Sequence, residues 1–469
     1  MGKYSRLGKN TVLVLIGNLG VKFIGIIMLP FYTRWLSVED YGITDIISVY
    51  VSVFLCIVSM NIADSVFIFP KGQPQETQKE YFSSGMAFIL CMLFFTFLIF
   101  EGFNIVAENI GLSNSLVNYL WYIYLMLVAN VIQQFCQQFV RSIDKMIIYS
   151  TTGIVQTITT ALAAFLLIPQ RGLIGFIISM ILASILATIY SFVVSGSLSF
   201  FSFKKISYKR LKEMLCYSIP LIPNGIMWWL VMSLNRPLME TYCGIYAIGL
   251  FAVANKLPTM ISMLHNVFGN AWQISVLEEY GEKDFDNFYN KIFRTYTILL
   301  FEVLTGIALF SDMFIFLFTT PNYYASSNYI VALCIGVVFM SLAGIAGSTF
   351  SAVKISKYYF YSSLWGVITA LLCNFSLIPL WGIWGAILSI IISNGIMLLS
   401  RLYYSWQFVH ITQPMRILTI IIAMFIVALT SFMHSVFIKS ILLIIMGIII
   451  LSLNKDLLQG KISLTLKHK

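Results

Sequence analysis

The sequence predicts an all-α integral membrane protein of about fourteen transmembrane helices. Hydrophobic residues make up 59% of the 469 residues and charged residues only 10%, a balance that excludes a soluble protein with a polar surface. The apolar runs are continuous and about 20 residues long, the length that a helix needs to cross a bilayer and about twice that of a membrane β-strand. The first run is too long for a signal peptide and lacks a small-residue cleavage site, so we expect it to remain in the protein.

The expected helices follow one another through short connections, the longest of about 15 to 20 residues. Each is an apolar run of spanning length, bounded by charged residues or turn-forming residues. They cover approximately residues 11–33, 41–69, 82–100, 117–140, 147–168, 173–198, 214–234, 244–272, 292–311, 328–350, 359–379, 383–404, 415–435 and 437–453.

The first helix contains a charge near its middle. Lys22 interrupts the apolar run, and Asn18 lies one turn earlier on the same face. An isolated ammonium at this depth costs about 3 kcal/mol, so such a helix is expected to face a hydrated cavity or a partner helix. The run then meets Pro30 and leaves the membrane through Arg34 and a polar turn. We interpret it as a cavity-lining helix.

The numbers of lysine and arginine residues differ between the connections on the two sides of the membrane. The connections on one side and both termini carry Lys3, Arg6, Lys9, Lys71, Lys79, Arg141, Lys145, Lys204, Lys205, Lys209, Arg210, Lys212, Lys283, Lys291, Arg294, Lys354, Lys357, Arg401, Arg416, Lys455, Lys461, Lys467 and Lys469. The opposite side has only Arg34, Arg171, Arg236 and Lys439. Both termini are therefore expected to be cytoplasmic. The net charge of +10 reflects this topology rather than a nucleic-acid partner.

An internal repeat divides the first twelve helices into two sets of six. Leu167 to Ser179 reads LIPQRGLIGFIIS and Leu377 to Ser389 reads LIPLWGIWGAILS, with Leu, Ile, Pro, both Gly and Ser in the same places. Six helices per copy keep both copies in one orientation, so we expect two six-helix bundles related by a pseudo-twofold axis along the membrane normal. The expected domains are 1–200, 201–410, and 411–469 with two additional helices and a cytoplasmic tail.

Few charges remain at membrane depth once the connections are set aside. Lys256 lies in the eighth helix beside Asn255, where Pro258 is expected to disturb the helix. The remaining members of this set are Glu302 in the ninth helix, Asp45 and Asp64 in the second, and Arg34, Arg236 and Glu240 at the outer mouth of the first and seventh. Because each is costly in lipid, we expect them to face a shared interior.

These charges leave two interpretations open. Lys22 and Lys256 either form a buried salt bridge with Glu302 or Asp64, or hold an anionic group such as a phosphate; we favour the second. Arg34 and Arg236 either recruit an anion or extend to the interface as ordinary boundary residues. Glu302, Asp64 and Asp45 either take up protons in a coupled cycle or neutralise the lysines.

Several classes of protein are disfavoured. The seven cysteines contain no CxxC and the four histidines have no ligand spacing, so no metal site or cofactor is expected. The chain has no GxxxxGK[ST] motif and no nucleophile with a plausible base, so it is expected to be neither an ATPase nor an enzyme. Gly344 and Gly347 in the tenth helix predict close helix packing, with a hinge as the alternative.

The opening pattern resembles a known family. Gly17 and Asn18, the mid-span lysine, LPFYTRWLS from Leu29 to Ser37, and DYG from Asp40 to Gly42 resemble polysaccharide and O-antigen flippases of the Wzx type. These belong to the multidrug/oligosaccharidyl-lipid/polysaccharide exporter superfamily, and the likeness extends over essentially the whole chain, including two six-helix halves and two extra helices.

The resemblance implies a function and a set of binding residues. A flippase of this type moves an undecaprenyl-pyrophosphate-linked oligosaccharide from the cytoplasmic to the outer leaflet of the bacterial inner membrane by alternating access, among membrane lipids and other polysaccharide assembly proteins. Its cationic cavity residues would correspond to Lys22 and Lys256, with Arg34 and Arg236 at the mouth and Asn18 and Asn255 beside the lysines. Lysine where some relatives carry arginine disfavours bidentate pyrophosphate recognition.

Two alternatives accompany this interpretation. A multidrug exporter of related architecture is expected to prefer anionic and aromatic groups in its cavity, and the two lysines weigh against it. A membrane glycosyltransferase or polymerase would need a large extramembrane loop that holds an acid, a base or a metal, and the expected connections are too short.

Overall fold

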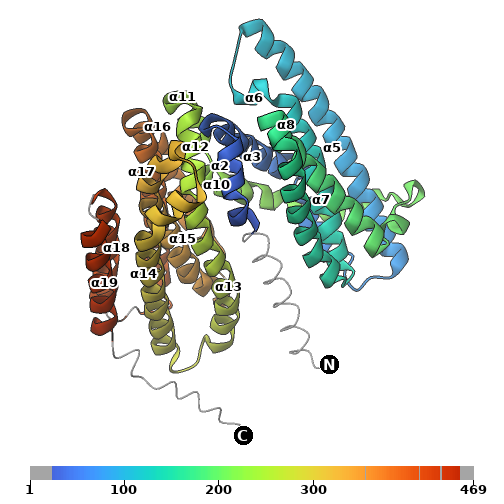
Figure 1. The fold of residues 1–469 in the computed structure, drawn as a ribbon. Coiled ribbons are helices and arrows are strands. Elements are labelled where there is room, and N and C mark those ends of the chain that lie inside the picture. The colour runs from blue at the N-terminus through green and yellow to red at the C-terminus, as the bar shows by residue number, and fades with distance from the viewer. Residues whose placement is uncertain (1–23, 354, 411, 413, 434–435, 455–469) are drawn as a thin grey trace. The chain divides into compact units, whose positions relative to one another are not determined.

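The computed structural model describes residues 24–353, 355–410, 412, 414–433 and 436–454. Over these residues the secondary structure is helical, without strands (Figure 1), which confirms the predicted all-α fold class. Packing divides the chain into two compact units, Met1–Glu240 with Gly244–Gly249, and Thr241–Cys243 with Leu250–Lys469. The division at residue 200 that we expected from the repeat remains a prediction.

The first unit is built from helices α2 to α10. They are α2 (Leu29–Trp35), α3 (Val38–Ser59), α4 (Ile62–Ile68), α5 (Gln75–Ile110), α6 (Ser115–Asn118), α7 (Leu120–Ser142), α8 (Met146–Ser195), α9 (Tyr208–Ser218) and α10 (Ile222–Met232). The chain passes from one unit to the other within α11 (Asn235–Cys243) and α12 (Ile245–Ala254).

The second unit contains α13 to α19. They are α13 (Lys256–Glu279), α14 (Phe285–Phe318), α15 (Ser327–Ala352), α16 (Lys357–Trp381), α17 (Ile383–Ser405), α18 (Pro414–Leu429) and α19 (Val436–Leu453). Short 3₁₀ segments η1 to η5 cover Ser197–Phe200, Phe203–Lys205, Ile219–Leu221, Pro321–Ser326 and Thr430–Phe432. In Figure 1, α18 and α19 lie side by side next to α14, and both pack against it.

The predicted number of fourteen membrane spans can be compared with the helices of the described residues. Nine described helices are long and apolar enough to cross a bilayer, or ten if α12 and α13 form one span bent by 45°. The helices α18 and α19 are apolar but shorter. The count of fourteen is therefore not confirmed, although α8 itself contains a break that separates two helices.

The second expected helix, 41–69, differs from the structure at both ends. It begins earlier because Ser37 and Asp40 form a capping box: Asp40 N donates to Ser37 Oγ at 3.0 Å, and Ser37 N donates to Asp40 Oδ2 at 3.2 Å. It ends at Ser59 because Met60 and Asn61 adopt positive φ angles of 45° and 53°. The rest of the expected span is the separate short helix α4.

The sequence repeat is also a repeat of backbone geometry. Gly172 breaks α8 at φ 54° and ψ −130°, and Gly382 joins α16 to α17 at φ 56° and ψ −125°. A side chain at Gly175 would collide with the carbonyl group of Leu167, and one at Gly385 with that of Leu377. Each copy is thus a helical hairpin whose single turn residue needs the left-handed backbone that glycine adopts freely.

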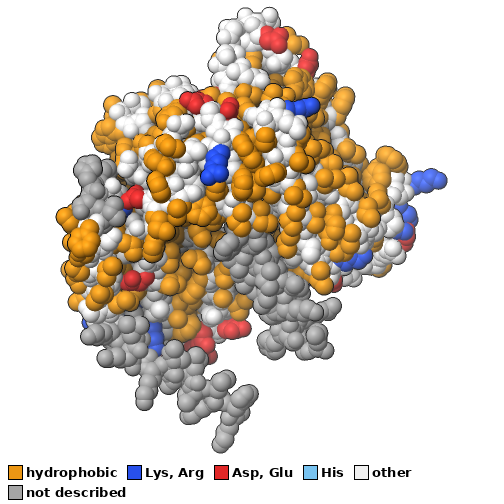
Figure 2. All heavy atoms as spheres, viewed as in Figure 1, with side chains coloured by type: hydrophobic (Ala, Val, Ile, Leu, Met, Phe, Trp, Pro, Cys, Tyr) orange, Lys and Arg blue, Asp and Glu red, His pale blue; other side chains and the backbone are white. Residues whose placement is uncertain are grey.

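Aromatic packing fills the core of the first unit. Phe82 on α5 is fully buried. The centre of its ring lies 4.4 Å from the ring centre of Phe139 and 5.5 Å from that of Phe135, both on α7. Outside the core, hydrophobic side chains cover much of the face seen in Figure 2, and charged ones are sparse on it. A protein with this surface is stable in lipid rather than in water.

Candidate functional site

An ion pair in the first unit joins two of the predicted site residues. Arg236 on α11 is only 8% exposed, and its Nε lies 3.4 Å from Asp45 Oδ2 on α3. The guanidinium also donates through Nη1 to the Met232 carbonyl oxygen and to Asn235 Oδ1. Arg236 and Asp45 were expected to face the same interior, but their pairing was not predicted. Their charges offset each other, which lowers the cost of burying Arg236.

Glu240 extends this polar network; it was expected at the outer mouth with Arg236, but no partner or binding role was predicted for it. Its Oε1 accepts a hydrogen bond from Ser115 N at 2.6 Å, and its Oε2 accepts one from the Tyr50 hydroxyl at 3.1 Å. The signal was available in the sequence, because positions four apart on a helix such as Arg236 and Glu240 share one face. The network ties α11 to α3 and α6.

Two further predicted residues of the first unit are exposed. Arg34 lies in the last turn of α2, and Asp64 lies on α4. Asp64 interacts electrostatically with Arg141, whose guanidinium lies 4.0 Å from the centre of the Phe67 ring. Neither side chain is buried, so both are accessible to water or headgroups outside the core of the unit.

Lys256 and Asn255 lie at a break in the second unit. Asn255 separates α12 from α13, and Lys256 is the first residue of α13, at a bend of 45°. The Lys256 carbonyl oxygen accepts a hydrogen bond from Thr259 Oγ1 at 2.6 Å. The predicted disturbance near Pro258 is therefore confirmed. Lys22 and Asn18 lie outside the described residues.

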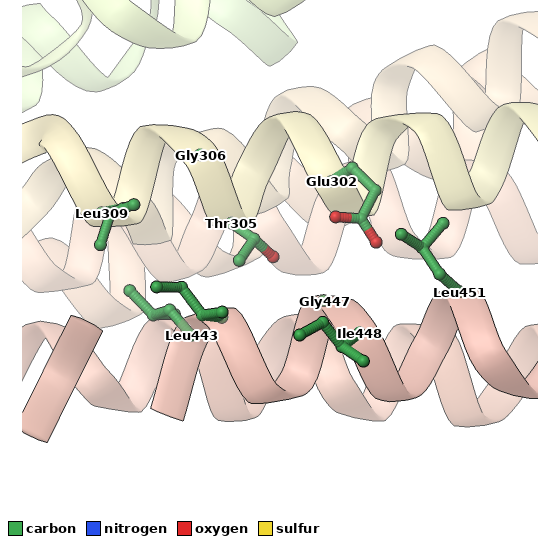
Figure 3. A pocket seen from close by; sticks show the side chains of 9 residues that line it. Glu302, Thr305, Gly306, Leu309, Leu443, Gly447, Ile448 and Leu451 are labelled. Atoms are coloured by element: carbon green, nitrogen blue, oxygen red, sulfur yellow. The ribbon is translucent and has the colours of Figure 1, made fainter. Parts of the chain in front are cut away.

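Glu302 lies in a pocket between α14 and α19 (Figure 3). The pocket has a volume of about 260 Å³, and eight other residues line it: Thr305, Gly306, Leu309, Leu443, Ile444, Gly447, Ile448 and Leu451. Glu302 Oε1 is buried and has no hydrogen-bond partner among the described residues. Thr305 carries the one hydroxyl of the lining, and that group donates to the Phe301 carbonyl oxygen. Glu302 thus presents a carboxyl group to an apolar pocket.

Three cations of the second unit that were expected in connections are buried: Lys439, Arg401 and Arg294. Lys439 on α19 is 3% exposed and lies 2.6 Å from Asp312 Oδ2 on α14. Arg401 on α17 is 4% exposed; it donates to the Ala343 carbonyl oxygen at 2.9 Å and to Ser362 Oγ at 3.2 Å. Charge counting along the sequence cannot distinguish a connection residue from one that turns back into the helix bundle.

The side chains around Arg401 explain why residue 347 of α15 is a glycine. A Cβ at Gly347 would lie 2.7 Å from Tyr359 Cε1 and 3.1 Å from Arg401 Nη1, and the Arg401 guanidinium lies 5.1 Å from the centre of the Tyr359 ring. A Cβ at Gly344 would lie 2.7 Å from His265 Cε1. The predicted close packing at both glycines is confirmed. In the described part of the chain, no three His, Cys, Asp or Glu side chains are placed to hold a metal ion.

Comparison with known proteins gives a family and a fold. The model of a family described as polysaccharide biosynthesis protein matches residues 7–273. No curated protein sequence matches the chain. The fold is similar to that of the lipid II flippase MurJ in an inward closed conformation, with a TM-score of 0.67 and 18% identity over 96% of this chain and 100% of that one.

Transporters of the MOP superfamily share the fold as well. An inward-facing multidrug resistance MATE family transporter aligns with a TM-score of 0.60 and 14% identity over 88% of this chain and 94% of that one. A MOP superfamily transporter from Pyrococcus furiosus aligns with a TM-score of 0.59 and 12% identity over 87% and 95% of the two chains. At these identities the likeness establishes the fold.

Proposed function

The chain belongs to the polysaccharide biosynthesis protein family, and on this premise we propose that it flips an undecaprenyl-pyrophosphate-linked oligosaccharide repeat unit, of the O-antigen or capsule type, from the cytoplasmic to the outer leaflet. It is a multi-pass membrane protein with the fold of MurJ and of MATE transporters. The family match and the fold support transport of a lipid-linked saccharide by alternating access. The proposed setting is the bacterial inner membrane, with both termini cytoplasmic and other polysaccharide assembly proteins as partners.

The chemistry of this cargo explains why charges are retained at membrane depth. A sugar pyrophosphate cannot cross hydrocarbon unaided and needs a hydrated, cationic path. The prenyl chain gains about 0.8 kcal/mol per buried CH₂ and is best left in lipid. A transporter of this cargo therefore needs a polar interior that opens laterally to the bilayer.

The observation that carries the proposal for the site is the position of Lys256 at the break between α12 and α13. A helix break leaves backbone groups that only protein, water or cargo can satisfy, and an ammonium beside it binds phosphate as a point charge. We assign cargo binding to Lys22, Asn18, Lys256 and Asn255. Arg34 and Arg236 complete the proposed set at the mouth, and Arg236 would exchange its ion pair with Asp45 for the cargo.

The three carboxylates of the proposed coupling set have different surroundings. Asp45 is paired with Arg236, Asp64 is exposed near Arg141, and Glu302 faces an apolar pocket. A carboxylate that is already paired or hydrated has little reason to bind a proton at neutral pH. Glu302 is therefore the strongest of the three candidates for ion coupling.

A multidrug exporter is the second candidate, and the fold shared with MATE transporters supports it. The two lysines favour an anionic cargo and weigh against this alternative. A glycosyltransferase or polymerase is the third candidate, and the transporter fold disfavours it.

The test is a leaflet-accessibility assay in reconstituted vesicles that contain the lipid-linked oligosaccharide. We expect the wild type to expose the saccharide on the opposite leaflet, and Lys22→Ala and Lys256→Ala each to slow this step at least about tenfold, the equivalent of one lost charged contact. Lys291→Ala, at an exposed lysine of α14, is the matched control. Normal translocation by both folded variants would refute the cationic site, and transport of aromatic cations alone by the wild type would favour the multidrug alternative.

A further inference from the structure

The accessory helix α19 is attached to α14 at two polar contacts, one near each end. Lys439 Nζ lies 2.6 Å from Asp312 Oδ2, and Arg294 Nε donates to Asn454 Oδ1 at 2.8 Å. Both cations are almost fully buried, at 3% and 7% exposure. The antiparallel helices are thus fixed in one register.

The Glu302 pocket lies between these two contacts. At 1.5 Å per residue, Glu302 is about 12 Å along α14 from Arg294 and about 15 Å from Asp312. The sum of about 27 Å is close to the 30 Å thickness of a hydrocarbon core. The two contacts therefore fit the two boundaries of the membrane, with Glu302 near its middle.

Within the described part of the chain, no other charged side chain lines the pocket. Its nine lining residues include no second titratable side chain. The only charged residue of α19 is Lys439, and the nearest charges on α14 are Arg294 and Asp312, both in the polar contacts. Among the other helices packed against α14, α15 has no charged residue, the one charge of α18 is Arg416 near its first residue, and the titratable groups of α13 are Lys256, His265, Glu278 and Glu279. Glu302 is not within salt-bridge distance of any described residue.

The pocket is open toward the surroundings of the unit. Ile444 and Ile448 on α19 are 52% and 61% exposed, and both line the pocket. In Figure 3 the Glu302 carboxyl group points from α14 toward the Gly447 region of α19. A Cβ at Gly447 would lie only 3.1 Å from Glu302 Oε2. Glycine at this position leaves room for the carboxyl group.

We propose that this pocket is a proton-binding site in which Glu302 is held as the neutral carboxylic acid, accessible to apolar reagents from the lipid. An ionised carboxylate without a partner is strongly disfavoured in an apolar surrounding, whereas the protonated group costs far less. The proton on Glu302 follows from the pocket itself. Its movement during transport rests on the function proposed above.

The test uses the reactivity of a protonated carboxyl group toward dicyclohexylcarbodiimide, an apolar reagent. The carboxyl oxygen adds to the central carbon of N=C=N while its proton passes to one nitrogen, and the acyl group then migrates to nitrogen. Nothing leaves and no atom is oxidised, so the product is one stable N-acylurea. The full chain in lipid vesicles is treated at neutral pH, and the modified peptides are identified by mass spectrometry.

We expect Glu302 to be modified at least about tenfold faster than the exposed Glu278 and Glu279 of α13. A water-soluble carbodiimide should reverse this order. Glu302→Gln should abolish the modification, and Gly447→Val should slow it by filling the pocket. Gly102→Val on α5, where a Cβ would meet no atom within 4 Å, is the matched control and should leave it unchanged. Unmodified Glu302, or equal modification by the two reagents, would overturn the proposal.

The outcome is separable from that of the proposed function. Selective modification of Glu302 in a protein that fails to move lipid-linked saccharide would support the proton site and refute the flippase. Normal flipping by a protein whose Glu302 remains unmodified would support the flippase and refute the proton site.

Discussion

The ammonium group of Lys439 is buried while the carboxylate that pairs with it is half exposed. The Lys439 side chain is 4% exposed and that of Asp312 48%, with 2.6 Å between Nζ and Oδ2. The desolvation cost of this pair therefore falls on the lysine. Removal of one partner should have a different effect from removal of the other.

We expect Asp312→Asn to destabilise the protein more than Lys439→Met. The first change leaves a buried ammonium unpaired and should cost about 2 kcal/mol, less than the 3–5 kcal/mol typical of fully buried pairs because water reaches Asp312. The second removes the buried charge and should change stability by less than about 1 kcal/mol. Thermal unfolding in detergent measures both, and an equal or reversed order would contradict the assignment.

Gly249 on α12 should not tolerate alanine. A Cβ there would overlap the Val38 carbonyl group of α3, with the carbonyl carbon only 2.8 Å away. We expect Gly249→Ala to cost about 1–3 kcal/mol, the usual range for overpacking. Gly102→Ala is the control, because an alanine within a helix with open space around it should raise stability by about 0.5–1 kcal/mol. Thermal unfolding of the two variants should move in opposite directions.

Arg401 should not be replaceable by lysine. Its guanidinium bonds to Ala343 and Ser362 through different nitrogens and lies over the Tyr359 ring. An ammonium cannot reproduce this planar arrangement. We expect Arg401→Lys to cost about 2 kcal/mol, measured by thermal unfolding, with Lys357→Arg as the control at a lysine whose Nζ lies 5.1 Å from the centre of the Tyr358 ring. Unchanged stability of Arg401→Lys would show that the charge alone matters.

The contribution of Glu240 to stability should depend on its negative charge. It accepts hydrogen bonds from Ser115 N and the Tyr50 hydroxyl through different oxygens. A glutamine can keep its oxygen on Ser115 N, but its amide must then donate to the Tyr50 hydroxyl oxygen, so two charge-assisted hydrogen bonds are replaced by two weaker neutral ones. We expect Glu240→Gln to cost about 1–2 kcal/mol in thermal unfolding. Glu108→Gln, whose exposed carboxylate bonds to Asn104, should be neutral, and a similar loss in both variants would contradict this role.

Much of the fold could be predicted because membrane helices are recognisable in a sequence from the length and apolarity of their segments. The repeat was recognisable from the matching residues of the two segments, and in the structure Gly172 and Gly382 have φ and ψ angles that agree within 5°. The break at Met60 and Asn61 was missed because the apolar run continues on both sides of it, although Asn61 is a residue type that often takes a positive φ at a helix end. Of the two C-terminal helices, expected at 415–435 and 437–453, α18 ends earlier, at Leu429, and α19 agrees to within one residue.

The candidate site was predictable only in part. The sequence identifies charges that are costly in lipid, and Arg236, Asp45, Lys256 and Glu302 were selected as candidates on this ground. Their partners depend on tertiary contacts between helices far apart in sequence, so the Arg236 pair with Asp45 and the Lys439 pair with Asp312 were missed. Charge counts assign a residue to a side of the membrane but do not show where its side chain points.

The turns at Gly172 and Gly382 bear on how the chain is made. Two helices joined through a single residue have no connecting loop. The end of the first helix therefore cannot stay hydrated outside the membrane while the second helix is synthesised. Such a pair is best inserted as one unit, because the second helix then shields the polar backbone of the turn as soon as it forms. A side chain at either glycine should therefore lower the yield of inserted protein during biosynthesis, before the stability of the finished molecule matters.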